Sequence, residues 1–257
     1  MTEPILVKQD GPVLTLAINR PEVDNKVNRE ALVLLRRHLD AADANRDVRV
    51  IVLTGEGTYF CAGGQIDGFP EGTVMAQREF ANAFAEFHRA ARRLSKPFVA
   101  AVNGDAVAGG FSLLAACDLA IAASTARFGL PELEAGLFPL LALATSVRLL
   151  PRKVVFDVIY NARKLSAAEA LSFGLVTKVV PPDELVLATQ QQAEELATRS
   201  PVAIAIGRSA YESMVGMGLD EALDHGGAML VHLLATDDAL EAYRARSEDR
   251  EPSWLLR

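Results

Sequence analysis

The chain has 257 residues, half of them hydrophobic and 23% charged, and a net charge of −7. This composition supports a full globular core and excludes a disordered chain, while the acidic balance argues against a general nucleic-acid binder. The two cysteines, a polar start without an apolar targeting core, and a longest apolar stretch (residues 137–150) that is interrupted by charge and proline predict a cytoplasmic protein without a membrane segment.

Strand and helix signals alternate in the first part of the chain. Residues 5–9 and 13–19 are β-rich runs around an Asp-Gly-Pro turn, which predicts a hairpin. Asn28 is a good cap for a helix that follows it. The apolar run at 48–53 is typical of a buried strand, and the aromatic residues spaced over 80–94 favour a helix with one core-facing side.

The middle of the chain continues this alternation. Residues 98–102 and 119–122 read as buried strands, with a helix-like run from Gly109 between them. Strands that alternate with helices predict an α/β fold with crossover connections. A capping box at 166–169 opens a short helix, and a last strand is expected at 175–180.

Beyond these elements the pattern is helical. Ser200 followed by proline predicts a helix start, and Thr236 can cap the final helix. We therefore divide the chain into a core of strands and helices over residues 1–199 and a C-terminal helical region over 200–257.

Glycines occur at two places where a predicted strand has just ended. Gly64 lies in the first segment and Gly109 in the second, and neither segment matches a phosphate-binding loop. Each glycine could serve only the turn that it occupies. Small residues also leave backbone N–H groups open to a ligand oxygen, and Gly109 would lie at a helix start, where the dipole favours negative charge. Two such amides can form an oxyanion hole.

Glu132 follows a proline among apolar neighbours. An apolar setting raises the pKa of a carboxylic acid toward the range useful for a general base. The alternative is an acidic residue that stabilises the first turn of a helix.

Taken together, these segments resemble the crotonase, or enoyl-CoA hydratase/isomerase, superfamily. The resemblance covers nearly the whole chain, and the order and spacing of its motifs are specific. The matching stretches are Asn19-Arg20-Pro21-Glu22 near the start, IVLTGEGTYFCAGG at 51–64, the segment from KPFVAAVNG to GLFP at 96–139, and ARKLSAAEALSFGLVTKVVP at 162–181.

The resemblance implies a fold, an assembly and a ligand. The fold is a core of repeated ββα units in a spiral, followed by a C-terminal helical region that forms trimers, which often pair into hexamers. The ligand is an acyl-CoA thioester, whose carbonyl oxygen would bind the backbone amides of Gly64 and Gly109. No metal or redox cofactor is implied, since coenzyme A is part of the substrate.

The resemblance also implies a binding path for the adenine and pantetheine parts of coenzyme A. This path follows two segments, residues 23–27 and 62–66. The residues assigned to it are Val23, Asn25, Lys26, Ala62, Gln65 and Ile66.

One departure from the family pattern bears directly on the reaction. Hydratases of the family use two glutamates: one follows the proline of a G-x-P-E motif, here Glu132, and one lies three residues after the second oxyanion glycine. The latter position holds Ser112. A serine hydroxyl can hydrogen-bond a water but is a very poor base at neutral pH.

Two further departures are found near the expected acyl pocket. Hydratases usually have a glycine-rich run where this chain has Leu140 and Leu141, and such bulky groups would make the pocket drier unless they pack elsewhere. Gln65 stands where aspartate is common in the family, and Asp67 follows two residues later as a candidate displaced acid.

Three functions remain open from the sequence. The preferred one is double-bond isomerisation of an enoyl-CoA with Glu132 as the single acid and base. The second is hydration of a 2-enoyl-CoA, or another lyase reaction of the superfamily. The third is an acyl-CoA binder that has lost its activity.

Overall fold

Two sheets form the centre of the computed structural model, which describes residues 3–65 and 71–254. The larger sheet has the strand order β1-β2-β3-β5-β7-β10. Its first pair is the predicted hairpin, with Ile5 opposite Ile18, and its other pairs are parallel. These strands are β1 (Ile5–Asp10), β2 (Val13–Ile18), β3 (Val50–Gly55), β5 (Phe98–Val102), β7 (Leu119–Ala123) and β10 (Lys178–Val180).

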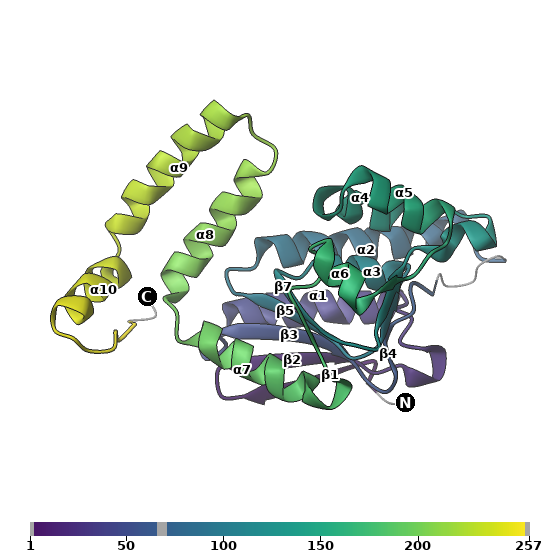
Figure 1. Ribbon diagram of the computed structural model, residues 1–257, viewed down its shortest axis with the longest axis horizontal. Coiled ribbons are helices and arrows are strands. Elements are labelled where there is room, and N and C mark those ends of the chain that lie inside the picture. The colour runs from purple at the N-terminus through teal and green to yellow at the C-terminus, as the bar shows by residue number, and fades with distance from the viewer. Residues whose placement is uncertain (1–2, 66–70, 255–257) are drawn as a thin grey trace.

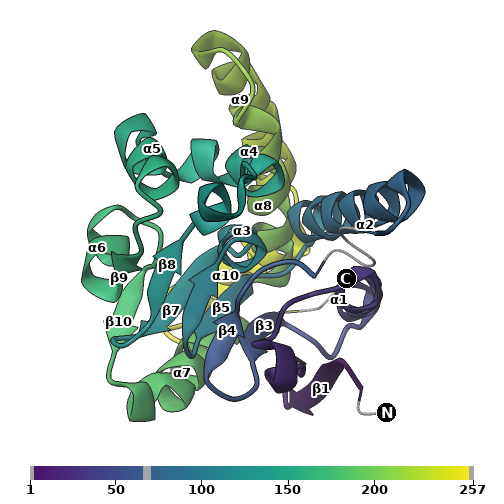
Figure 2. The same cartoon turned by 90° about the vertical axis from the view of Figure 1, so that its right-hand side faces the viewer.

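The smaller sheet has the order β4-β6-β8-β9 and consists of strands of two or three residues. The chain passes from the larger sheet to the smaller one three times, from β3 to β4, from β5 to β6 and from β7 to β8 (Figure 2). This repetition confirms the predicted α/β core. The short strands are β4 (Tyr59–Cys61), β6 (Asp105–Val107), β8 (Arg127–Gly129) and β9 (Leu165–Ser166).

Helices cover both faces of the larger sheet. Figure 1 shows α1, α2 and α3 on one side and α7 on the other. The helices are α1 (Arg29–Ala44), α2 (Val74–Arg93), α3 (Gly109–Ala115), α4 (Leu140–Leu149), α5 (Arg152–Tyr160), α6 (Ala167–Ser172), α7 (Leu185–Ala197), α8 (Pro201–Met214), α9 (Leu219–Leu234) and α10 (Asp237–Ser247), with 3-10 turns η1 (Pro21–Val23), η2 (Pro131–Ala135) and η3 (Pro182–Glu184). No helix in the described ranges is long and apolar enough to cross a membrane.

The predicted helix caps are present. The side chain of Asn28 accepts from the N–H of Ala31, and Ser166 forms a complete capping box with Glu169. Ser200 and Thr236 cap α8 and α10 in the same way. These local bonds fix where the helices start, because they satisfy N–H groups that have no partner within the helix.

The last predicted strand is shorter than expected. Residues 175–180 were expected to pair, but β10 contains only 178–180. The N–H groups of Leu175 and Val176 bond to the carbonyl of Ala170 and so finish α6. Both side chains are buried in the core, which explains the apolar run that predicted a strand.

The C-terminal helices extend away from the sheets (Figure 1). α8 and α9, which the structure describes in full, contain no buried residue, although α9 carries Leu219, Leu223 and Leu230 with more than half of each side chain exposed. The division of the chain near residue 200 and the role of these helices in assembly both stay predictions.

Arg208 of α8 makes several contacts with the core. Arg208 forms a two-point ion pair with Asp118, at 2.7 and 2.9 Å, and its side chain is only 12% exposed. The same guanidinium donates to the carbonyl groups of Ala91 and Leu94, where α2 ends. The C-terminal region is therefore attached to the end of α2 by a largely buried charge.

Candidate active site

Three neighbouring parallel strands end at the same edge of the smaller sheet. β4 pairs with β6, with Cys61 beside Ala106, and β6 pairs with β8, with Val107 beside Gly129. The N–H of Ala108 also donates to the carbonyl of Gly129 at 2.8 Å. Ligands of α/β proteins bind beyond the carboxyl ends of strands. The segments that hold Gly64, Gly109 and Glu132 all start at this edge.

Gly64 and Gly109 lie against each other. A methyl group added to Gly109 would be 3.1 Å from the backbone nitrogen of Gly64, and one added to Gly64 would be 2.6 Å from the ring of Phe80. Gly64 is exposed and Gly109 is partly exposed. Within the described residues, no group accepts a hydrogen bond from either amide. Their proximity is what an oxyanion hole requires, and that role stays a prediction.

The turn before Gly109 is unusual. Ala108 has a φ of +50°, a region that costs a residue with a side chain about 1–3 kcal/mol. This conformation ends β6 abruptly and starts α3 at Gly109. Gly110 is packed so closely that an added methyl group would be 2.0 Å from the carbonyl oxygen of Cys61. The backbone at Gly109 and Gly110 can approach its neighbours this closely only because neither residue has a side chain.

Glu132 lies in η2, three residues past β8. Its Oε2 atom is buried and has no hydrogen-bond partner within the described residues. Burial raises the pKa of Glu132 above its ordinary value of 4.5, and its own backbone N–H opposes this shift. No described cation forms an ion pair with it. A carboxylate in this state is suited to accept and return a proton.

Ser112 is completely buried in α3 and belongs to a polar cluster. Its hydroxyl lies 3.0 Å from Nε2 of His88, on α2, and 3.1 Å from the hydroxyl of Thr145, on α4. The sequence reasoning missed both partners. The signal for His88 was present, because it lies four residues after Phe84 and so shares the inward face of the predicted aromatic helix.

Leu140 and Leu141 begin α4, the helix that carries Thr145. Leu140 is 71% exposed and Leu141 is 38% exposed, so neither packs into the core. Both therefore remain available to contact a ligand, and their place in the acyl pocket stays a prediction.

The two segments assigned to coenzyme A lie side by side. Val27 and Gly64 form an isolated parallel bridge, and Gln65 donates its N–H to the carbonyl of Val27 at 2.8 Å. The N–H of Ala62 bonds to the carbonyl of Asp24 in the same arrangement. Val23, Lys26 and Ala62 are partly exposed along it. Ile66 and Asp67 fall outside the described residues.

Gln65 and Asn25 hold this pair of segments in different ways. The guanidinium of Arg20 donates to the side chain of Gln65 at 2.8 Å, on the surface. Asn25 is completely buried, accepts from the N–H of Arg20, and donates to the carbonyl groups of Glu56 and Tyr59. Asn25 therefore fixes the loop instead of offering a free amide to a ligand, which changes the role expected of it.

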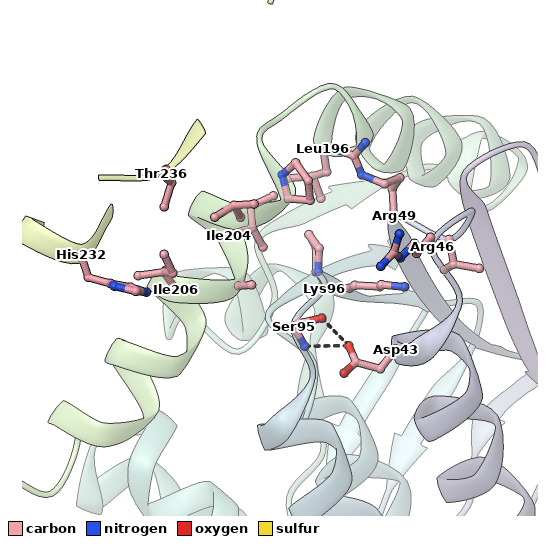
Figure 3. A pocket seen from close by; sticks show the side chains of 15 residues that line it. Asp43, Arg46, Arg49, Ser95, Lys96, Leu196, Ile204, Ile206, His232 and Thr236 are labelled. Carbon is pink, nitrogen blue, oxygen red and sulfur yellow. Dashed lines mark hydrogen bonds between the residues drawn. The ribbon is translucent and has the colours of Figure 1, made fainter. Parts of the chain in front are cut away.

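A separate cavity of about 370 Å³ lies between α8 and the core. Its lining includes Arg46, Arg49 and Lys96, and Asp43 accepts two hydrogen bonds from Ser95 (Figure 3). It is found at the amino ends of β3 and β5, whereas the two glycines follow the carboxyl ends of β4 and β6. This cavity is therefore distinct from the glycine site. No metal-binding group of His, Cys, Asp and Glu occurs within the described ranges.

Comparison with known proteins gives a consistent result. The family model for enoyl-CoA hydratase/isomerase matches residues 8–256. An enoyl-CoA hydratase of Mycobacterium tuberculosis is 32% identical, with 98% of this chain and 96% of that protein covered. A carnitinyl-CoA dehydratase of Salmonella enteritidis is also 32% identical, over 99% of both chains.

A solved structure agrees with these relatives. An enoyl-CoA hydratase of Mycobacterium smegmatis has a TM-score of 0.94 at 28% identity, with 98% of this chain and 99% of that chain covered. The sequence matches and the fold indicate the same family, and the chain is a member of the enoyl-CoA hydratase/isomerase family.

Proposed function

We propose that this enzyme isomerises an enoyl-CoA thioester, moving a double bond from C3–C4 to C2–C3. Support comes from a carboxylate, Glu132, whose segment leaves the smaller sheet at the same edge as those of the two glycines. Glu132 has a buried oxygen without a partner among the described residues and a raised pKa, while Glu134, two residues later, is exposed.

In the proposed reaction the thioester carbonyl oxygen accepts hydrogen bonds from the N–H groups of Gly64 and Gly109. The carboxylate of Glu132 takes a proton from C2, and the electron pair spreads over the dienolate, with negative charge on the carbonyl oxygen. Glu132 then returns the proton to C4, which leaves the double bond at C2–C3. No water is consumed and no atom is lost, so one acid/base group is enough.

The observation that carries this proposal is the state of Ser112. According to the family resemblance, Ser112 stands where hydratases have their second glutamate. Ser112 is completely buried, and its hydroxyl is bonded to His88 and Thr145. A hydroxyl in this state cannot act as the second carboxylate that holds and polarises an attacking water.

Hydration is the second candidate, and the names of the relatives favour it. The proteins most similar in sequence include enoyl-CoA hydratases and a carnitinyl-CoA dehydratase. If the pocket lacks only a carboxylate for hydration, Ser112→Glu would produce a large gain in water addition. A gain of less than a few-fold would mean that other features of the pocket also oppose water.

The test uses 2-enoyl-CoA and 3-enoyl-CoA esters in ¹⁸O-labelled water, with mass analysis of the products. We expect the 3-enoyl ester to become the 2-enoyl ester without label. Rapid incorporation of label into the 2-enoyl substrate would refute isomerisation as the main reaction. An unchanged mixture of both esters, with CoA-ester binding retained, would instead identify an inactive acyl-CoA binder.

We infer that the enzyme works as a trimer or a dimer of trimers in the cytoplasm. The apolar residues exposed on α9, together with Tyr211 and Val215 at the end of α8 and beyond it, provide the surface for such an assembly. Sedimentation of the purified chain measures the subunit number, and a monomer at micromolar concentration would contradict the inference.

A further inference from the structure

Three helices meet at the polar cluster around Ser112. α2 provides His88, α3 provides Ser112 and α4 provides Thr145. Ser112 lies three residues after Gly109, so the two residues share one side of α3. The cluster therefore lies on the same side of α3 as the proposed oxyanion amide, less than one turn away.

The directions of the hydrogen bonds follow from counting protons. The hydroxyl of Thr145 contacts the carbonyl of Ala142 at 2.9 Å, and a carbonyl can only accept. Thr145 therefore uses its one proton there and must accept from Ser112. Ser112 then has no proton left for the imidazole, so His88 donates its Nε2–H to Ser112. Only this assignment satisfies all three contacts.

The surroundings of His88 favour the uncharged form that this assignment requires. The rings of Phe84 and Phe87 lie 5.0 and 5.3 Å from the imidazole, measured between ring centroids. Burial lowers the pKa of His88 to about 4. Within the described ranges no acidic side chain forms an ion pair or hydrogen bond with it. A neutral imidazole has one donor nitrogen, and here the geometry assigns the donor to Nε2.

We propose that His88 is a positioning residue of the active site, which donates from Nε2 to Ser112 and thereby keeps this wall of the acyl pocket uncharged and without a free hydroxyl proton. This inference rests on the proposed function for its expected readout in the reaction, but the hydrogen-bond direction is independent of it.

The physical consequence concerns both the helix and the water. With the chain of donors running from His88 through Ser112 and Thr145 to the carbonyl of Ala142, none of the protons remains to orient a water molecule for attack. The same bonds tie α3 to α2 and α4 and so hold the amide of Gly109 in place. Loss of the donor on His88 would loosen α3 and open its polar surface to water.

A matched pair of variants tests the proposal. The amide nitrogen of glutamine can take the place of Nε2, whereas that of asparagine is too short to reach Ser112. We expect His88→Gln to keep the isomerisation kcat within about threefold of the parent chain. His88→Asn should lower kcat about tenfold, since one hydrogen bond in the site is lost. The KM for the CoA ester should change little in both, and ¹⁸O incorporation should rise only in His88→Asn.

Different results would overturn it. Activity of both variants within twofold of the parent chain would show that the donor has no role. A loss of activity in both variants of the same size would show that an amide donor cannot replace the imidazole, which the proposal requires. Thermal unfolding of each variant checks that it is folded, so that a loss of activity is not mistaken for misfolding. Glutamine and asparagine have similar polarity, which makes the two variants comparable.

The tautomer provides a readout that does not depend on turnover. The chain has four histidines, so a spectrum of ¹⁵N-histidine-labelled protein at pH 7 is simple, and the signals missing from His88→Gln belong to His88. We expect a proton on Nε2 and none on Nδ1; the opposite tautomer would refute the proposal even if isomerisation is established. If the parent chain does not isomerise the 3-enoyl ester while the Nε2 tautomer is observed, the proposed function fails and the hydrogen-bond assignment stands.

Discussion

The two ends of the polar side of α3 differ in what they offer a ligand. At its start, Gly109 and the adjacent Gly64 present backbone amides that no described group accepts from. Less than one turn later, Ser112 is closed off, and its hydroxyl contacts are taken by His88 and Thr145. The open end is made of main chain and can bind an oxygen, whereas the closed end uses side chains and can bind nothing further without rearrangement.

This difference teaches how one family fold supports more than one reaction. Enolate stabilisation needs only the open end, which depends on two glycines and the strained turn at Ala108. Addition of water also needs a second acid at the closed end, where this chain has a hydroxyl whose proton is already used. In the proposed mechanism, the choice between reactions depends on the side chains of three helices and not on the fold.

The largest effect is expected at Glu132, the proposed acid and base. Glu132→Gln retains the shape of the side chain but cannot take a proton, so we expect kcat to fall about 10²–10⁴-fold. Binding of a non-reactive CoA ester, measured by calorimetry, should be retained. Full turnover by this variant would assign the acid/base role to another residue and contradict the proposed role of Glu132.

The next largest effect belongs to the open end. In Gly109→Ala the added methyl group would be 3.1 Å from the nitrogen of Gly64 and 3.3 Å from the ring of Phe84. The methyl group would block the space in which an oxygen binds, and we expect kcat to fall about 10²–10³-fold, as when an oxyanion donor is lost. Steady-state kinetics with a 3-enoyl-CoA measures this, and activity within threefold of the parent chain would place the oxyanion elsewhere.

The pH dependence of the reaction reports on Glu132 itself. Burial raises its pKa above 4.5, and the base is active only when ionised. Activity should therefore rise with pH through this raised pKa, and it should fall about tenfold for each pH unit below it. A profile of kcat/KM whose acid limb has its midpoint at or below 4.5 would contradict a buried catalytic carboxylate.

A smaller effect is expected at the closed end. Ser112→Ala leaves the Nε2–H of His88 without its partner, and we expect up to about a tenfold loss in kcat. Label from ¹⁸O water should stay absent, because alanine cannot orient a water. Addition of water by Ser112→Ala would show that the hydroxyl itself was excluding it.

A helix cap outside the proposed catalytic groups provides the control with the smallest effect on catalysis. Ser166→Ala removes the capping box of α6, and we expect the free energy of unfolding to fall by about 1 kcal/mol. The kcat should not change, since Ser166 is not among the groups proposed to contact the substrate. Chemical denaturation and kinetics of the same sample check both statements, and a change in kcat would mean that general destabilisation also lowers the activity of the other variants.

Local signals in the sequence predicted much of the fold. The hairpin, the caps at Asn28, Ser166, Ser200 and Thr236, and the buried face of α2 are set by neighbouring residues, so the sequence contains enough information to find them. The smaller sheet was not predicted in detail. Its strands have only two or three residues, too few for alternation to be detected.

The candidate site was predicted by family resemblance more than by pattern. The segments with Gly64, Gly109 and Glu132 lie at one edge because of strand register, which the residues alone do not reveal. His88 was missed because it looked like part of an aromatic stripe, and its partner Ser112 is 24 residues away. Asn25 was assigned to the ligand through the family resemblance, which does not reveal that this side chain is enclosed.

Arg208 connects α8 to the end of α2. Its guanidinium holds the last carbonyl groups of α2, and the same helix carries Phe80, Phe84 and His88 beside the glycines and Ser112. A shift of α8 would therefore move the end of α2, and the middle of α2 forms part of the candidate site. The position of the C-terminal region is therefore linked, through one side chain, to the helix that carries His88.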